Sequence, residues 1–266
     1  MIFSKYRGFG MDQLPSGQLG NHLFQANLLF QVEQEVGVKS FHKTFDGSKL
    51  FPALNRTGFL FPRNPNARQL SREEILEMPW ENLIQLTKEC LESGEVLLFP
   101  RGILGEYHYT CSRIHPSSFF ELPKDASFHN RLRVAIHLRG RDFQTWDNTA
   151  ILPSEYYLDA LNYLRETCSE DFDLTVFTDD KSLPAYKLLR ERVPFAVDGS
   201  GQKLQDFVDL GNSDCIISSP STFAFWAALL GNPKIVIHSK NWVHRKMESG
   251  DIFWSRLNDT QKIMLI

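Results

Sequence analysis

The sequence predicts an α/β protein built around parallel strands, and three observations support this fold class. Short apolar runs rich in branched residues recur through the second half of the chain, at 132–138, 174–177, 215–218 and 234–238. Segments with helical spacing of apolar residues separate these runs, and turn residues stand between the segments. Strands that read as continuous apolar runs are covered on both faces, so helices are expected on both sides of the sheet.

The first half of the chain predicts shorter and more often interrupted elements. Apolar residues from His22 to Val36 recur at helical spacing after a loop that ends at Asn21. Ser71 and Glu74 form the pattern of a capping box, which marks the start of a helix, and Pro79 interrupts that helix. The expected elements, in chain order, are a strand at 1–6, helices at 22–36, from 71 and at 81–91, and a strand at 95–99.

The second half predicts a cleaner alternation of strands and helices. Ser154 is expected to cap the helix that follows the strand at 132–138. The expected helices are 154–166, 181–192, 204–212 and 221–230, with a further short strand at 195–197. In open parallel sheets ligands bind beyond the carboxyl ends of the strands, so polar residues that directly follow the apolar runs are the candidates for chemistry.

Composition and charge exclude several classes of protein. The chain has 266 residues and a formal net charge of −3, which argues against broad binding to nucleic acid, since that requires a basic excess. Its four cysteines show no CxxC spacing, so no zinc or redox motif is indicated. The N-terminus lacks the apolar core of a signal peptide, and the apolar stretch at 223–230 is too short to span a bilayer. A cytoplasmic protein is expected, with peripheral membrane contact and oligomeric state left open.

The first candidate site is the run from His137 to Phe143, which follows the strand at 132–138. It brings an imidazole, the guanidiniums of Arg139 and Arg141, and the carboxylate of Asp142 to the end of one strand. Arginine offers a fixed fork of donors that matches the oxygens of a diphosphate. A leaving nucleoside diphosphate gains negative charge, which a preorganised arginine stabilises. The alternative is an Arg–Asp ion pair that closes a surface turn.

Two further candidates stand at strand ends. Asp179 and Asp180 follow the strand at 174–177, where carboxylates can hold ribose hydroxyls, orient an arginine or bind a metal. The alternative is that one of them caps the next helix. Ser221 and Thr222 stand at another strand-to-helix junction, where hydroxyls and N–H groups form an anion site. The alternative there is a simple Ser/Thr cap with a proline that sets the turn.

Four blocks of the chain follow one another in an informative order: Gly17–Gln25, His137–Phe143, Phe177–Asp180 and Ile216–Leu229. They match, in turn, the patterns GG-L-G-N-Q-x-F-Q, H-x-R-R-G-D-[FY], F-[ST]-D-D and I-I-A-N-S-T-F-S-W-W-G-A-x-L. Together they resemble the fucosyltransferase superfamily, and most closely the family 11, α-1,2-fucosyltransferase-like glycosyltransferases. The resemblance runs through most of the chain, although only the four blocks are specific.

The resemblance implies a GT-B-like architecture of two Rossmann-like domains that face each other across a cleft. Residues 1–130 would form the acceptor-side domain and residues 131–266 the domain that binds GDP-fucose, with a last helix that returns to the N-terminal domain. The implied reaction is an inverting, metal-independent transfer of L-fucose from GDP-β-L-fucose to a glycan hydroxyl, α-1,2 to a terminal galactose. The implied partners are the nucleotide-sugar donor and a glycan acceptor, with no cofactor.

Site residues follow from the same resemblance by position. Arg139 is implied to bind the β-phosphate and, with Asp142, to be catalytic. His137 is implied to help hold the nucleotide, and the aspartates after the third block to shape the guanosine site. The implied donor-binding residues are Gly20, Asn21, His137, Arg139, Arg141, Asp179, Asp180, Ser221 and Thr222.

One departure from the family pattern and one rival motif bear on this interpretation. The second block reads Arg-Gly-Arg-Asp where the family has Arg-Arg-Gly-Asp, so Arg141 is displaced by one position. Asp171 and Asp173 spell the DxD of metal-dependent transferases, but the pair precedes an apolar strand instead of following one, so a solvated turn is expected and no metal site. The general base stays open among three residues, Asp12, His22 and Asp142.

Two other functions stay open on the sequence. One is a transferase of the same fold that uses another donor or makes another linkage, since the blocks constrain the acceptor weakly. The other is a non-catalytic nucleotide-sugar or glycan-binding protein, which the displaced arginine favours.

Overall fold

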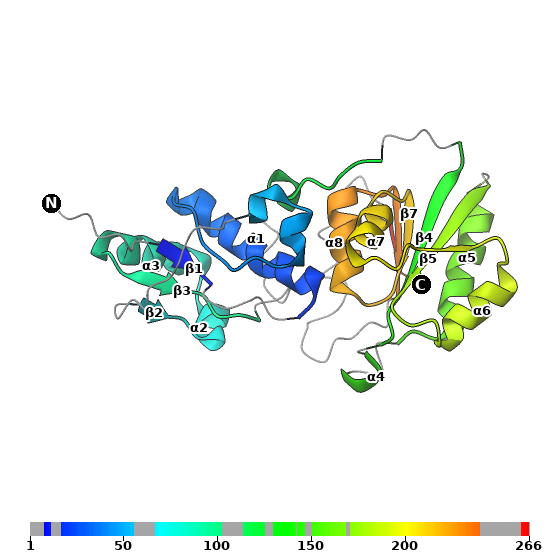
Figure 1. Cartoon of the computed structure of the whole chain (residues 1–266), viewed down its shortest axis with the longest axis horizontal. Helices are drawn as coiled ribbons and strands as arrows, with labels where there is room; N and C mark the ends of the chain where they lie inside the picture. Colours follow the sequence, from blue (N-terminus) through cyan, green and yellow to red (C-terminus); the bar gives the residue numbers. More distant parts are fainter. Residues whose placement is uncertain are drawn as a thin grey trace. The chain divides into compact units, whose positions relative to one another are not determined.

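The computed structural model describes residues 8–11, 17–55, 67–102, 114–125, 130–141, 143–146, 151–168, 171–239 and 262–265. The chain divides into two compact units, 1–121 and 122–266, and each has its own parallel sheet (Figure 1). Within the described ranges, no helix combines the length and the apolar character needed to cross a membrane.

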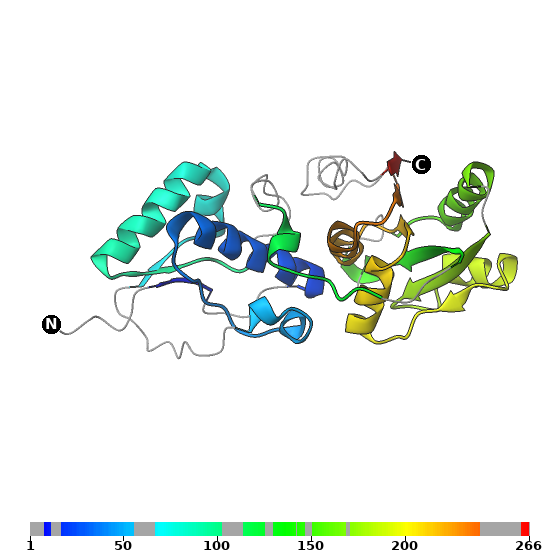
Figure 2. The ribbon, with the colours of Figure 1, turned by 90° about the horizontal axis from the view of Figure 1, so that it is seen from above.

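The first unit contains a three-stranded parallel sheet in the order β1-β3-β2. Its elements are β1 (Gly8–Gly10), α1 (Leu19–Val36), β2 (Ala67–Gln69), α2 (Arg72–Glu77), α3 (Trp80–Ser93) and β3 (Val96–Leu98), with 3-10 turns at Asp46–Lys49, Pro52–Leu54 and Pro116–Ser118. Its core lies between α1, α3 and the sheet, where Leu29, Leu83 and Leu97 are buried in one cluster (Figure 2). The strand expected at 1–6 lies outside the described residues.

Helix α1 begins at Leu19, before the expected start at His22, so the loop is shorter than expected. Leu19 is buried in the core, and the burial of its side chain stabilises the extra turn. Gly20 and Asn21 therefore lie inside the first turn of the helix. The helix ends at Gly37, whose φ of 71° is the left-handed conformation that glycine adopts readily.

The capping box expected at the start of α2 is confirmed. Ser71 Oγ accepts the N–H of Glu74 at 3.0 Å, and Glu74 Oε2 accepts the N–H of Ser71 at 2.6 Å. Pro79 follows α2 and stands at the N-cap of α3, as expected for a residue that cannot continue a helix.

The second unit holds a six-stranded, parallel sheet in the order β6-β5-β4-β7-β8-β9. Its elements are β4 (Leu132–Leu138), α4 (Phe143–Trp146), α5 (Ser154–Thr167), β5 (Phe172–Thr178), α6 (Pro184–Arg192), β6 (Val197–Asp198), α7 (Lys203–Gly211), β7 (Cys215–Ser218), α8 (Thr222–Gly231), β8 (Ile235–His238) and β9 (Lys262–Leu265). Counted in chain order within the unit, the strands run 3-2-1-4-5-6, the order of Rossmann folds. The order reverses between β4 and β7, which makes this pair the topological switch point.

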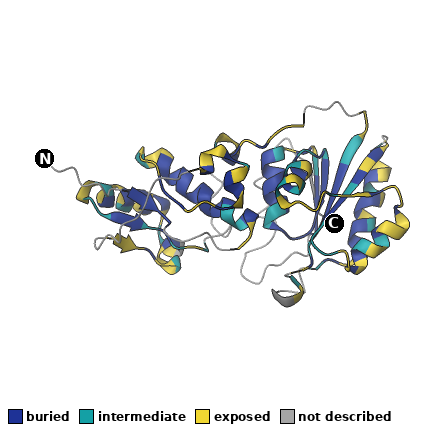
Figure 3. Ribbon diagram, viewed as in Figure 1, coloured by how far each residue is buried: buried dark blue, intermediate teal, exposed yellow. Residues whose placement is uncertain are grey.

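Helices cover both faces of this sheet, as the sequence predicts (Figure 1). On one face, Leu138 of β4 joins a core cluster with Leu161 of α5 and Leu189 of α6. On the other face lie α7 and α8. Residues Ala224–Leu230 of α8 are all buried, which explains why this helix is apolar on every side (Figure 3).

Helices α7 and α8 approach each other closely at two glycines. A Cβ built on Gly231 would lie 1.8 Å from the carbonyl oxygen of Gly211. Backbone cannot yield by that distance, so this contact requires glycine at position 231.

Several boundaries differ from the expectation, and each difference has a local cause. Ser154 does not cap α5, because Pro153 is the N-cap and Ser154 is the first helical residue. Helix α6 begins at Pro184 instead of 181, because Asp180 and Ser182 form a hydrogen-bonded turn before it. Strand β9 was not expected. The expected return of a last helix concerns residues after 239, of which the structure describes only those of β9.

The connection between the two units is anchored on both sides of Glu121. On the side of the first unit, Phe120 is fully buried, and its ring centroid lies 5.4 Å from those of Phe30 and Phe51. On the other side, Leu122 is buried, and its side chain lies where a Cβ on Gly211 would be.

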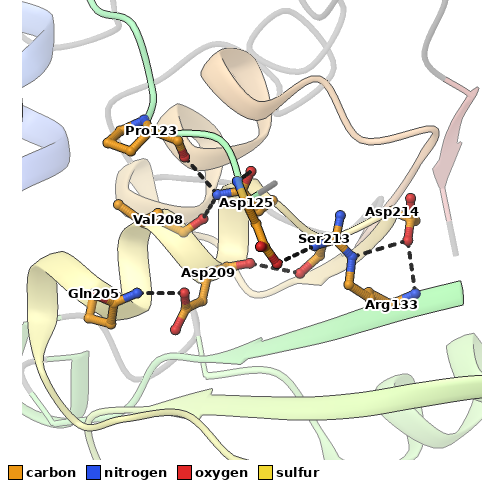
Figure 4. Close-up of polar contacts among 9 residues, drawn as sticks. Pro123, Asp125, Arg133, Gln205, Val208, Asp209, Ser213 and Asp214 are labelled. Atoms are coloured by element: carbon orange, nitrogen blue, oxygen red, sulfur yellow. Dashed lines mark hydrogen bonds and ion pairs between the residues drawn. The ribbon is translucent and has the colours of Figure 1, made fainter. Parts of the chain in front are cut away.

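The chain that follows Leu122 forms hydrogen bonds and ion pairs with residues at the amino-terminal edge of the second sheet (Figure 4). Asn212, which follows α7, donates to the carbonyl of Pro123 at 2.8 Å and accepts the N–H of Asp125 at 3.2 Å. Arg133 near the start of β4 pairs with Asp125 at 3.2 Å and with Asp214 at 3.4 Å. These contacts begin before residue 130, where the sequence placed the domain boundary.

Candidate functional site

Three strand ends of the second sheet meet at its switch point. Strand β4 pairs with β5 so that Leu138 lies beside Thr178, and with β7 so that His137 lies beside Ser218. The segments that follow these strands therefore leave the sheet at one edge, where ligands of such folds bind. The predicted residues at this edge are His137, Arg139, Arg141, Asp179, Asp180, Ser221 and Thr222.

His137 lies on the face of the sheet that α8 covers. Its Nδ1 is 2.8 Å from the Ser219 hydroxyl, and its ring stacks on Phe223 with centroids 5.6 Å apart. Burial, followed by the charge of Arg139, lowers the pKa of His137 to about 3. The imidazole is therefore neutral near pH 7, where it ties β4 to β7, and a group with so low a pKa is a weak base.

Arg139 is oriented by the carboxylate of Asp179. Arg139 Nη1 lies 3.0 Å from Asp179 Oδ2, and the two side chains are 19% and 26% exposed. The other carboxylate oxygen, Oδ1, accepts the N–H of Gly140 at 3.0 Å and that of Arg141 at 3.4 Å. The guanidinium carbon of Arg139 also lies 5.7 Å from the ring centroid of Phe143. One carboxylate thus fixes both the arginine side chain and the turn that carries it.

The Arg-Gly-Arg order has a packing reason. A Cβ built on Gly140 would lie 2.7 Å from both methyl carbons of Leu183, a side chain that is itself buried before α6. A larger residue at this position would require the buried Leu183 side chain to shift. The second arginine of the block therefore follows the glycine, and Arg141 is exposed to solvent.

Asp180 does not cap α6, the alternative that the sequence offered, because Leu183 is the N-cap; Asp180 closes the turn before the helix instead. Its Oδ1 accepts the N–H and the hydroxyl of Ser182 at 2.8 and 2.6 Å, and its Oδ2 accepts the side-chain amide of Gln144 at 2.8 Å. The hydroxyl and then the N–H of Ser182 lower the pKa of Asp180, and the charge of Arg141 adds to this effect. Asp180 is thus an anchor for the loops around the site.

Ser221 caps α8, because its hydroxyl oxygen accepts the N–H of Phe223 at 3.2 Å. Ser221 is buried, and Thr222 is the first residue of the helix. The cap confirms the structural alternative without excluding an anion site. A capped helix still presents the positive end of its dipole, and here that end lies beside the end of β4.

The remaining predicted residues belong to the first unit or lie outside the described part. Gly20 and Asn21 form the first turn of α1, and the ring of His22 meets Phe45 edge-on with centroids 5.0 Å apart. Their approach to a donor stays a prediction. Two residues, Asp12 and the predicted catalytic Asp142, lie outside the described residues.

Sequence reasoning missed two residues that shape this edge. The Tyr156 hydroxyl on α5 lies 3.0 Å from the carbonyl oxygen of Ser218 and 3.2 Å from that of Ile237, so it bridges the ends of β7 and β8. An aromatic residue on the apolar side of a helix looks like any core residue, so the sequence held no signal for it. Ser219 had a signal, since it directly follows a predicted strand and can reach the histidine of the neighbouring strand.

The DxD pair lies away from this edge. Asp173 is the second residue of β5, at the amino end of the strand, and it pairs with Arg131 at 2.9 Å. The expectation of a turn there was wrong in part, because β5 begins at Phe172 and includes Asp173. Among the described residues, no three His, Cys, Asp or Glu side chains are grouped so as to hold a metal ion.

No family model matches the chain, and no curated protein matches it. The fold is similar to that of POFUT1 in complex with GDP, with a TM-score of 0.54 and 12% identity over 98% of this chain and 99% of that one.

Two other solved structures match less well. NodZ of Bradyrhizobium, an α-1,6-fucosyltransferase soaked with GDP-fucose, matches with a TM-score of 0.49 and 14% identity over 85% of this chain and 93% of that one. The ADP-heptose LPS heptosyltransferase II of E. coli matches with a TM-score of 0.36 and 12% identity over 52% of this chain, which spans 40% of that enzyme. Similarity to POFUT1 over nearly the full length of both chains confirms the expected α/β, GT-B-like fold, while membership of family 11 stays a prediction.

Proposed function

We propose that this protein is an inverting glycosyltransferase that moves L-fucose from GDP-β-L-fucose to a hydroxyl of a glycan. The observation that carries the proposal is the arrangement at the switch point. Arg139, held by Asp179 at 3.0 Å, stands at the end of β4, and the capped N-terminus of α8 follows the neighbouring strand β7. Two sources of positive potential thus flank one strand pair, as a diphosphate requires.

The chemistry follows from where charge develops. As the acceptor hydroxyl attacks the anomeric carbon, the bond from that carbon to the β-phosphate oxygen breaks and its electrons stay on the diphosphate. A fixed guanidinium and the helix N-terminus stabilise this charge, and they cost no reorganisation at the moment of reaction. They also supply the positive charge that other transferases take from a divalent cation, so we propose that the transfer needs no metal.

The roles of the neighbouring residues are proposed from their contacts. Asp179 positions Arg139, and Asp180 anchors the adjoining loops. Both aspartates therefore contribute to the site without contacting guanosine. His137 fixes the spacing of β4 and β7 behind the site. Its pKa of about 3 makes it a weak proton acceptor, so we propose that the proton of the acceptor hydroxyl goes to another group.

The acceptor side of the proposal rests on the resemblance in the four sequence blocks. We propose a glycan with a terminal galactose as the acceptor, an α-1,2 linkage as the product, and the first unit as the platform for the glycan. The fold likeness to POFUT1 supports a fold suited to GDP, since that structure contains GDP.

The deciding experiment measures release of GDP from GDP-fucose by the full chain, in EDTA, with and without galactose-terminated oligosaccharides. The expected result is release that depends on the acceptor and is unchanged when Mg²⁺ or Mn²⁺ replaces EDTA. Tight binding of GDP with no release on any acceptor would identify a non-catalytic binding protein. Release from a different sugar nucleotide would identify another donor, and absence of GDP binding in calorimetry would refute the site itself.

A further inference from the structure

A cavity of about 220 Å³ opens at the carboxyl end of β4, on the face of the sheet that α5 and α6 cover. Its walls are mostly apolar and include Leu138 of β4, Leu152 before α5, and Leu183 and Ala185 at the start of α6. Successive residues of a strand point to opposite faces, so Leu138 faces this cavity while His137 faces α8. The cavity therefore lies on the opposite side of the sheet from the α8 N-terminus that the proposed diphosphate site uses.

The cavity contains a polar group that the fold leaves unused. Tyr157 of α5 lines it and is only 2% exposed. Burial alone raises the pKa of Tyr157, and no hydrogen bond from a described residue contributes to the shift. The preceding residue gives the contrast, since Tyr156 is also buried but has two carbonyl partners. None of the described residues forms a hydrogen bond with the Tyr157 hydroxyl, and a molecule in the cavity would supply a partner for it.

The other polar groups around the cavity are donors or carry positive potential. Ser154 lies one turn before Tyr157 on the same side of α5 and also lines the cavity. The first residues of α5 and of α6 both stand at the cavity, so two helix N-termini raise the potential there. Arg139 lines it as well, with one guanidinium nitrogen engaged by Asp179.

Size and lining together define the ligand. A cavity of about 150 Å³ is sufficient for a benzene molecule, whereas drug-sized ligands occupy about 300 Å³ or more. The space here suits one ring with one small substituent, and the apolar walls suit the ring. The donors and the positive potential select a substituent that only accepts hydrogen bonds and carries negative charge.

We propose that this cavity binds a small monocarboxylate that carries a single apolar ring, with the carboxylate bonded to the hydroxyls of Tyr157 and Ser154 and the ring against Leu138 and Leu183. The cavity shares Arg139 with the proposed donor site but lies on the opposite face of the sheet, and its occupation does not depend on transferase activity.

Benzoate is the probe for the test, titrated into the full chain by calorimetry. The chain is expected to bind benzoate at one site and to bind the neutral analogue benzamide at least about tenfold more weakly, because a charged acceptor forms the stronger hydrogen bonds. Tyr157→Phe should weaken benzoate about fivefold or more without lowering the melting temperature, since it removes a hydroxyl that has no partner in the fold.

Tyr156→Phe is the matched control on the same helix. It should lower the melting temperature, because it leaves two buried carbonyls without their donor, and it should leave benzoate affinity unchanged. Ala185→Leu, which fills the cavity with a larger apolar side chain, should abolish binding while the far-ultraviolet circular dichroism spectrum stays that of the wild type.

Three results would overturn the proposal. The first is no benzoate binding by the wild-type chain, and the second is equal affinity in wild type and Tyr157→Phe. The third is competitive displacement of benzoate by GDP, which would make the cavity part of the nucleotide site. With saturating GDP, benzoate is instead expected still to bind, with an affinity lowered by less than about tenfold, because the two ligands share Arg139 but otherwise lie on opposite faces of the sheet.

Discussion

Arg139→Ala separates the proposed catalytic contribution of this side chain from its contribution to folding. In the folded protein the guanidinium pairs with Asp179 at 3.0 Å, and both side chains are partly exposed at 19% and 26%. Solvent screens such a pair, which contributes about 1 kcal/mol or less. After the substitution Asp179 still accepts the N–H groups of Gly140 and Arg141, so its carboxylate keeps partners. The melting temperature should therefore fall by only about 3 °C for a chain of this size.

The effect on transfer should be much larger than the effect on stability. A fixed donor aimed at the charge that develops on a leaving group contributes on the order of 3 kcal/mol, which is a loss of more than about a hundredfold in rate. Rates of GDP release, calorimetric affinity for GDP and the melting temperature should be measured on the same preparations. Arg139→Lys should restore little activity, because a point charge does not reproduce the two-pronged contact.

Arg141→Ala is the matched control, since this exposed arginine stands two residues later in the same turn. It should lose activity by a smaller factor than Arg139→Ala, with an unchanged melting temperature. A folded Arg139→Ala variant that transfers fucose at close to the wild-type rate would refute the proposed site.

Other substitutions test the remaining contacts. Asp179→Asn keeps an acceptor for the backbone turn but loses the ion pair, so it should reduce kcat far more than stability, and equal kinetics to wild type would contradict its positioning role. His137 is buried with a pKa of about 3, so below pH 6.5 the unfolded state takes up a proton that the folded state refuses, and stability falls by up to about 1.4 kcal/mol per pH unit. In urea unfolding between pH 6 and 4, His137→Gln should show a shallower fall than wild type; parallel curves would count against the buried neutral imidazole. Gly231→Ala should prevent folding or lower the melting temperature steeply, because its Cβ meets backbone at 1.8 Å, whereas Gly37→Ala, with nothing within 4 Å, should cost about 1 kcal/mol for its left-handed φ.

The sequence was sufficient for the elements whose signal is local. Strands β4 and β7 have the expected bounds, because a strand covered on both faces is a continuous apolar run that polar residues end abruptly. The capping box of α2 was visible because both of its partners stand within one turn. Strand β9 was not predicted. Its four residues pair with β8, which lies more than twenty residues earlier in the chain, and so short a run shows no periodicity that would indicate this pairing.

The candidate site also has a part with a local sequence signal and a part without one. Arg139 could be predicted from its place after a strand, and so could the neighbourhood of the aspartates. The separate roles of Asp179 and Asp180 could not be predicted, because Asp179 reaches Gly140 only through the parallel register of β4 and β5. The same holds for Tyr157, because its burial beside the cavity depends on what surrounds it in three dimensions.

The one-residue junction at Glu121 bears on how chains of this kind diversify. Phe120 remains with its aromatic neighbours in the first unit, and Leu122 remains against α7 in the second. Recombination between genes at this codon would deliver each half with its anchors intact and would disturb none of the contacts described at either edge. A lineage can therefore inherit a new first unit, the proposed glycan platform, while it keeps an old second unit, the proposed nucleotide module, and a chimera spliced at Glu121 is the natural starting point for testing whether the acceptor changes without the donor.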